Sequence, residues 1–141
     1  MIKQATNSIY YHIVFYVKNN VSFSTDELGK VYEFAKNVCI ENEIKLYEIG
    51  GTDNHIHLLV ALSTKFNIHT MANLLKDSSS NFVMNNLKKS NTYIWKDGFG
   101  YFNVSSQHLS FVSTYIKKQV QHHKMEFVFP ELEDINPKTL K

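Results

Sequence analysis

The stretch that decides the fold is residues 54–62, which read Asn-His-Ile-His-Leu-Leu-Val-Ala-Leu. We interpret it as a β-strand, in which successive side chains point to opposite faces. His55 and His57 therefore share one face of the strand, where they either bind a single metal ion together or are two half-exposed histidines with nothing bound. The apolar residues that fall on the other face, where we expect the core, are Ile56, Leu58, Val60 and Leu62.

A second informative stretch is residues 115–119, which read Tyr-Ile-Lys-Lys-Gln within a predicted helix. Side chains four residues apart share a helix face, so Tyr115 and Gln119 are expected side by side. Tyr115 is either a core aromatic or a functional group. Other side chains can already supply the apolar face of this helix, namely Phe111, Val112, Ile116 and Val120. His122 and His123, further along, are either metal ligands or cationic side chains favoured by the helix dipole.

The composition describes an ordinary globular protein. The 141 residues are 43% hydrophobic and 20% charged, with a formal charge of +2 that is too small to demonstrate a polyanionic partner. All fifteen basic residues are lysines, so the chain has no arginine to grip a phosphate with two hydrogen bonds. The single cysteine, Cys39, excludes an intramolecular disulfide, and no stretch is apolar enough to span a membrane. We expect a cytoplasmic protein.

The remaining elements follow from the same periodicities. The sequence predicts strands at 8–18, 44–49 and 101–105, a turn at 50–54, a loop at 90–100, and helices at 24–43, 68–89 and 107–124. This order predicts an α+β fold, a ferredoxin-like or RRM-like β-α-β-β-α-β antiparallel sheet followed by a C-terminal helix. The strand of residues 54–62 is then central, and its outward face is expected to form an open platform. We expect one domain over 1–141, with a core of about 8–124 and a tail at 125–141.

Four stretches in the same order resemble the HUH single-tyrosine transposases, which include small insertion-sequence transposases and REP-associated tyrosine transposases. The first reads Tyr-Tyr-His-Ile-Val-Phe at 10–15, and the second is residues 49–60 with the histidine pair. The third is residues 95–105, and the fourth, residues 115–124, begins with the tyrosine. The resemblance covers residues 8 to about 129.

The resemblance implies a catalytic site and a reaction. His55 and His57 would be metal ligands, Gln119 the third ligand, and Tyr115 the catalytic nucleophile on the C-terminal helix. Members of this family cut single-stranded DNA beside hairpins at the ends of a mobile element. They form a 5′-phosphotyrosine, leave a free 3′-OH and rejoin strands without ATP. The resemblance implies Mg²⁺ or Mn²⁺ as cofactor, whereas imidazole ligands alone would favour zinc or another transition metal.

The chain departs from the family pattern at three places. Asn54 replaces a common acidic residue, Gly100-Tyr101 stands where Gly-Ala is frequent, and Lys118 stands where Asn is common. None of these departures removes a catalytic group. Without arginine, the DNA phosphate contacts would have to come from lysines. The candidates for DNA binding are Lys76, Lys88, Lys89, Lys96, Lys117 and Lys118.

Two other functions remain open. A domesticated or inactive relative would only bind structured single-stranded DNA, with its tyrosines stacking on bases. An unrelated metal-dependent phosphoesterase could use His55, His57, His122 and His123, and would release a hydrolysed product without a protein–DNA adduct.

We also expect a homodimer. The strand at 101–105 should lie at an exposed, apolar sheet edge, which can pair with a second copy. Resemblance to the insertion-sequence members points to sharing of the tyrosine helix between subunits, whereas resemblance to the REP-associated branch favours a monomer.

Overall fold

The sheet in the computed structural model has four antiparallel strands in the order β2-β3-β1-β4. Their bounds are β1 (Tyr10–Tyr16), β2 (Lys45–Gly51), β3 (His55–Ala61) and β4 (Gly100–Val104). The structure describes residues 9–62 and 64–118, so Gln119, His122, His123 and the tail lie outside the described residues. Strand β3 pairs with β2 and β1, and β4 pairs with β1 at the other end of the sheet. The predicted ferredoxin-like order and the central position of the histidine strand are confirmed.

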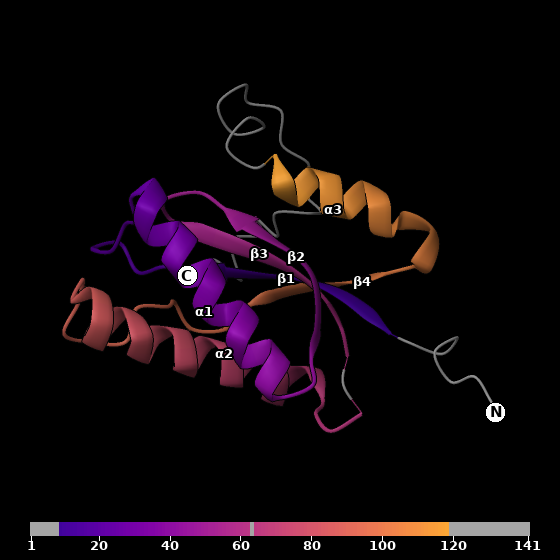
Figure 1. Ribbon diagram of the computed structural model, residues 1–141, viewed down its shortest axis with the longest axis horizontal. Coiled ribbons are helices and arrows are strands. Elements are labelled where there is room, and N and C mark those ends of the chain that lie inside the picture. The colour runs from indigo at the N-terminus through magenta and orange to yellow at the C-terminus, as the bar shows by residue number, and fades with distance from the viewer. Residues whose placement is uncertain (1–8, 63, 119–141) are drawn as a thin grey trace.

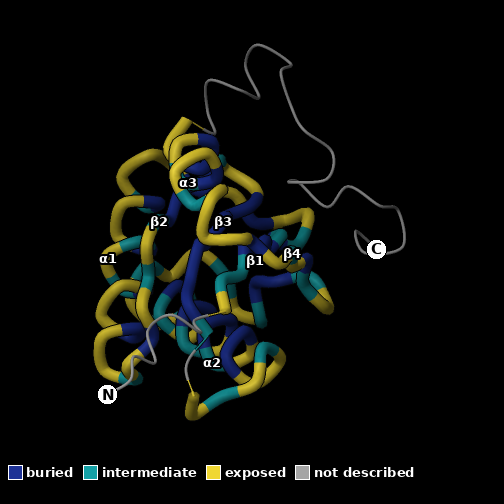
Figure 2. Tube along the Cα trace, turned by 90° about the vertical axis from the view of Figure 1, so that its right-hand side faces the viewer, coloured by how far each residue is buried: buried dark blue, intermediate teal, exposed yellow. Residues whose placement is uncertain are grey.

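Helices cover both faces of the sheet. One face carries α1 (Thr25–Glu41) and α2 (Ile68–Phe82), which continues into a π-helical turn, η2 (Val83–Leu87). The other face carries α3 (Leu109–Lys117), which follows a short 3₁₀ turn, η3 (Ser106–His108). Figure 1 and Figure 2 show α3 on the opposite side of the sheet from α1 and α2. Within the described residues, no helix is long and apolar enough to cross a membrane.

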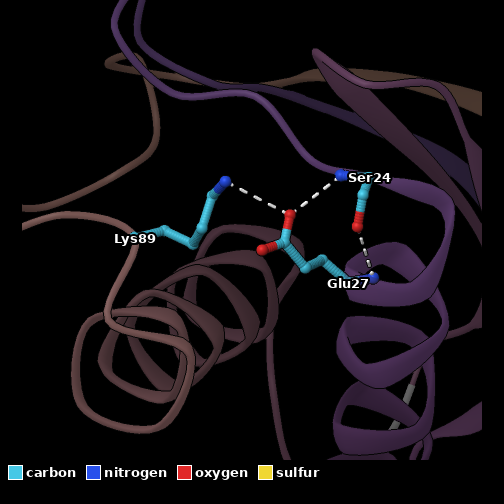
Figure 3. A network of polar contacts seen from close by, with 3 residues as sticks. All are labelled: Ser24, Glu27 and Lys89. Atoms are coloured by element: carbon cyan, nitrogen blue, oxygen red, sulfur yellow. Dashed lines mark hydrogen bonds and ion pairs between the residues drawn. The ribbon is translucent and has the colours of Figure 1, made fainter.

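Helix α1 begins with a capping box formed by Ser24 and Glu27. The Ser24 hydroxyl accepts a hydrogen bond from the Glu27 N–H (3.2 Å), and the Glu27 carboxylate accepts one from the Ser24 N–H (2.8 Å). The same carboxylate oxygen lies 3.2 Å from the Lys89 ammonium, at the far end of the α2 segment (Figure 3). These contacts, the backbone hydrogen bond most of all, lower the pKa of Glu27. They connect the start of α1 to the chain just after η2.

The main core lies between the sheet and the pair α1 and α2, where Figure 2 shows buried segments from both layers. Ile56, Leu58 and Val60 are buried there, as the alternation in β3 predicts. Trp95 is also fully buried, and its indole N–H lies 3.0 Å from the Ser79 hydroxyl of α2. The face of β3 that carries the histidines is therefore turned away from this core.

That second face is not the open platform that the sequence led us to expect. Helix α3 packs over it, and Val112 and Ile116 form a small apolar cluster with Leu59 of β3. The helix comes close because Gly50 has no side chain: a Cβ there would lie 2.6 Å from the Ile116 carbonyl oxygen. Gly50 and the following glycine belong to β2 and pair with β3, so the prediction that they begin a turn was wrong. The absence of a side chain at Gly50 instead lets the backbone of α3 come close to β2.

Candidate active site

The two histidines of β3 lie together beneath α3. Their ring centroids are 5.0 Å apart, and both side chains are buried, with His57 fully inaccessible. Tyr16 of β1 is opposite His55 in the strand pairing, and its ring stacks on the His55 ring with centroids 5.3 Å apart. The structure therefore brings together the pair that alternation in the sequence predicts.

A third histidine joins this pair. His12 of β1 is fully buried, and its Nε2 atom lies 2.6 Å from Nδ1 of His57. Sequence reasoning placed His12 in the first strand but assigned it no role. The signal that would have found it is the pairing of β1 with β3, in which Val14 is opposite His57 and His12 is opposite Leu59. Residues opposite each other in antiparallel strands share a face.

The other histidine is oriented by the turn before β3. The Asn54 side-chain oxygen lies 2.7 Å from Nδ1 of His55 and also accepts a hydrogen bond from the Thr52 hydroxyl (3.2 Å). An amide oxygen can only accept, so Nδ1 of His55 is the donor in this pair. Asn54, where family members commonly have an acidic residue, thus supplies an oxygen acceptor to the histidine that follows it.

These contacts leave the histidine pair in a form that suits a metal. A ligating histidine typically donates one ring N–H to a neighbouring acceptor and keeps a lone pair on the other nitrogen. Nδ1 of His55 donates to Asn54, and Nδ1 of His57 faces a nitrogen of His12, so each Nε2 can be the ligating atom. Among the described residues, no three His, Cys, Asp or Glu side chains converge as a metal cluster. The expected third ligand, Gln119, lies outside the described residues.

Tyr115 is positioned against this pair by the packing of α3. Its ring stands edge-on to the His57 ring, with centroids 6.2 Å apart, and only 2% of the residue is exposed. The helix is held on β2 by the close approach at Gly50 and by a hydrogen bond from Ser113 to the Glu48 carboxylate (3.1 Å). Segments far apart in the sequence thereby place a phenol beside two imidazoles.

The apolar face of α3 differs from the one we assigned. Phe111 was expected to pack, yet it is 53% exposed, while Val112, Tyr115 and Ile116 are the buried residues of the helix. Tyr115 therefore lies on the side of the helix that faces the sheet, between residues of the apolar cluster. Its burial fits a packing role as well as a chemical one, and the adjacent histidines favour the chemical one.

The lysines proposed to contact DNA lie in different environments. Lys117 and Lys118 are exposed at the end of α3, close in sequence to Tyr115. Lys76 is buried, and its ammonium group donates to the carbonyl oxygens of Lys96 (2.9 Å) and Gly98 (2.7 Å). Burial lowers the pKa of Lys76. This ammonium is directed to the protein's own backbone, so we leave Lys76 out of the DNA contacts proposed below.

Two more of these lysines follow the second helical segment. Lys88 caps η2 in a left-handed backbone conformation and is exposed, and Lys89 pairs with Glu27. Both follow helices that cover the face of the sheet opposite α3. They are therefore separated by the sheet from the histidines and Tyr115.

Comparison with known proteins identifies the family. The family model described as "Transposase IS200 like" matches residues 5–119. That match covers the β1 histidine, the histidine pair of β3, Tyr115 and Gln119. The chain therefore belongs to the IS200-like transposase family. No curated protein sequence matches the chain.

Two solved structures share the fold. A protein of Deinococcus radiodurans R1, described as a candidate transposase, aligns with a TM-score of 0.63 at 16% identity. That alignment covers 84% of this chain and 96% of the other chain. A REP-associated tyrosine transposase bound to a REP hairpin aligns with a TM-score of 0.61 at 11% identity, over 84% of this chain and 69% of its own. At these identities the likeness establishes the fold alone.

Proposed function

We propose that this chain is an HUH single-tyrosine transposase that cleaves and rejoins single-stranded DNA at the ends of a mobile element. Tyr115 would attack the scissile phosphate, and His55 and His57 would hold a divalent cation, Mg²⁺ or Mn²⁺. The observation that carries the proposal is the edge-on contact of Tyr115 with His57, which joins a phenol to an oriented histidine pair. Membership of the transposase family makes DNA the expected substrate.

The chemistry follows from what these side chains can do. A tyrosine hydroxyl has a pKa of about 10 and needs help to act as a nucleophile at neutral pH. A divalent cation bound by the histidines would draw charge from the scissile phosphate and orient it for attack. The Tyr115 oxygen forms a bond to phosphorus as the bond to the 3′ oxygen breaks. The phenol loses its proton, and the 3′ oxygen leaves as a free hydroxyl.

Tyr115 and the histidine pair are nearly inaccessible in this structure, at 2% exposed for Tyr115, 4% for His55 and 0% for His57. A scissile phosphate can therefore reach them only if entry of the DNA strand uncovers them. The phosphotyrosine that forms can be attacked by a later 3′-OH, which rejoins the strands without ATP.

The proposed DNA substrate carries hairpins at the ends of the mobile element. The solved REP-associated transposase, which shares this fold, is bound to a REP hairpin. Lys117 and Lys118 are exposed next to Tyr115 and would contact phosphates near the cleaved bond. Such contacts fix the position of the strand but carry no sequence information.

Incubation with single-stranded DNA from the boundaries of the gene tests this function. With Mn²⁺ or Mg²⁺ we expect a protein–DNA adduct that survives denaturing electrophoresis, and none when EDTA replaces the metal. Cleavage without an adduct would favour a hydrolytic phosphoesterase. Tight hairpin binding with neither cleavage nor adduct would favour a relative that only binds DNA.

A further inference from the structure

The turn between β2 and β3 brings three polar side chains together at the edge of the candidate active site. The Asn54 side-chain oxygen lies 2.7 Å from Nδ1 of His55, and the Thr52 hydroxyl oxygen lies 3.0 Å from the same nitrogen. The Thr52 hydroxyl also donates a hydrogen bond to the Asn54 oxygen (3.2 Å). The three groups thus form a closed triangle, in which two oxygens converge on one imidazole nitrogen.

Backbone hydrogen bonds and a ring contact hold this triangle in place. The N–H of Thr52 donates to the carbonyl oxygen of His55 (2.9 Å) across the turn. The N–H of Val17, just after β1, donates to the carbonyl oxygen of Asn54 (3.0 Å). The Tyr16 ring stacks on the His55 ring with 22° between their planes. The side chains of the triangle are therefore held within reach of one another.

An asparagine side chain can face a neighbour with either of two groups. Its oxygen accepts hydrogen bonds, its NH₂ group donates them, and a half turn of the amide exchanges the two. The Asn54 oxygen faces His55 and accepts from both the Nδ1–H of that ring and the Thr52 hydroxyl. The Thr52 hydroxyl can donate in this way only while the oxygen faces it, so it favours this orientation of the amide.

The orientation of the Asn54 amide determines which nitrogen of His55 carries the hydrogen. A neutral imidazole has one N–H, and the nitrogen that faces an acceptor carries it. With the Asn54 oxygen on Nδ1, the lone pair of the ring is on Nε2. The reversed amide would turn its NH₂ group toward Nδ1 and require the lone pair there. Nε2 would then carry the hydrogen and could not bind a cation.

We propose that Thr52 is a positioning residue of the candidate active site. Its hydroxyl keeps the Asn54 oxygen on His55 and thereby selects the Nδ1–H form of this histidine. A carboxylate at position 54 would not need this help, because both of its oxygens accept hydrogen bonds. The consequence for metal binding rests on the proposed function, whereas the form of His55 can be measured without metal or DNA.

Two-bond ¹H–¹⁵N correlation spectra of the metal-free protein, at mildly alkaline pH, test the proposal. They show which ring nitrogen of a neutral histidine carries the hydrogen. Thr52→Val nearly preserves the shape of the side chain but removes the hydroxyl, and Thr52→Ser keeps the hydroxyl. The matched control is Thr70→Val, at an exposed threonine in α2. The His55 signals are identified by their loss in His55→Gln.

We expect the Nδ1–H form in the wild type, Thr52→Ser and Thr70→Val, and a substantial population of the Nε2–H form in Thr52→Val. Adding Asn54→Asp to Thr52→Val should restore the Nδ1–H form, since a carboxylate accepts in either orientation. The Nε2–H form in the wild type, or an unchanged form in Thr52→Val, would overturn the proposal. So would a change in Thr52→Val that Asn54→Asp does not reverse, because the hydroxyl would then not act through the amide.

Calorimetric titration with Mn²⁺ separates this inference from the proposed function. We expect Thr52→Val to weaken Mn²⁺ binding roughly 10-fold, at the lower end of the usual effect of losing a partner of a ligating histidine, and Asn54→Asp to restore it. If the form of His55 changes as expected but the wild type does not bind Mn²⁺, the metal in the proposed function is wrong and the role of Thr52 stands. If the wild type binds Mn²⁺ and Thr52→Val matches it in both measurements, the role of Thr52 is wrong and the proposed function stands.

Discussion

Nε2 of His12 lies 2.6 Å from Nδ1 of His57, within a fully buried pair that joins β1 to β3. One nitrogen of such a close pair must carry the shared hydrogen and the other must accept it. If Nε2 of His57 binds the cation, its Nδ1 donates and His12 accepts. His12 then orients a metal ligand without touching the metal itself.

Replacing His12 tests this positioning role. His12→Leu removes the acceptor and should lower the affinity for Mn²⁺ by about 10- to 100-fold, the usual effect of losing such a partner. His12→Gln keeps an acceptor oxygen at a similar reach and should recover much of that affinity. Isothermal titration with Mn²⁺ measures both, alongside thermal unfolding to monitor the fold. Equal affinities for the Leu and Gln variants, with both folded, would show that the hydrogen bond does not matter.

The histidine pair itself should be required for cleavage. His55→Ala or His57→Ala removes a proposed ligand and should lower cleavage by orders of magnitude, because the phosphate is no longer activated. Hairpin binding, measured by fluorescence anisotropy, should persist. Gln119→Ala should be milder, since a neutral amide contributes less to holding a cation. Full cleavage in EDTA would show that the reaction does not need a metal ion.

The close approach of α3 should depend on Gly50. A Cβ at this position would lie 2.6 Å from the Ile116 carbonyl oxygen, so Gly50→Ala must displace the helix that carries Tyr115. We expect a loss of about 1–3 kcal/mol in the free energy of unfolding, as in other overpacked sites, and a larger loss of cleavage.

Gly29→Ala is the matched control for this glycine. Gly29 lies in α1, and a Cβ there meets nothing within 4 Å. That change should raise the free energy of unfolding by roughly 0.5–1 kcal/mol and leave cleavage unchanged. Urea unfolding and the cleavage assay check both variants. A Gly50→Ala protein with wild-type cleavage would show that the position of α3 is not critical.

Assembly into a homodimer remains a prediction. Among the described strands β4 has a single neighbour, β1, and its Tyr101 is 43% exposed. Such an edge can pair with a second copy.

Mixing Tyr115→Phe subunits with His57→Ala subunits asks whether the active site is shared. Restored cleavage would mean that Tyr115 acts on the partner's histidines. Absent cleavage would mean that each site forms within one chain, and sedimentation as a monomer with and without DNA would remove the dimer.

The histidine pair and the core face of β3 were predictable because side-chain alternation within one strand is visible in the sequence. His12 was not, since its contact with His57 depends on the register between β1 and β3, which alternation within a strand does not set. Gly50 was misassigned to a turn because glycine marks turns and close approaches alike. We expected Phe111 on the buried face of α3, but it is exposed. The position of the helix over β2 decides which of its side chains are buried, and hydrophobicity alone does not reveal that position.

The location of the covalent bond to DNA tests the central claim most directly. Trypsin cuts after Lys96 and Lys117, so residues 97–117 form one peptide that contains both Tyr101 and Tyr115. Tandem mass spectrometry of the nuclease-trimmed adduct can therefore place the phosphate on one tyrosine or the other. The account predicts phosphate on Tyr115, an adduct lost in Tyr115→Phe and an adduct retained in Tyr101→Phe. Phosphate on any other residue, or an undiminished adduct in Tyr115→Phe, would contradict it.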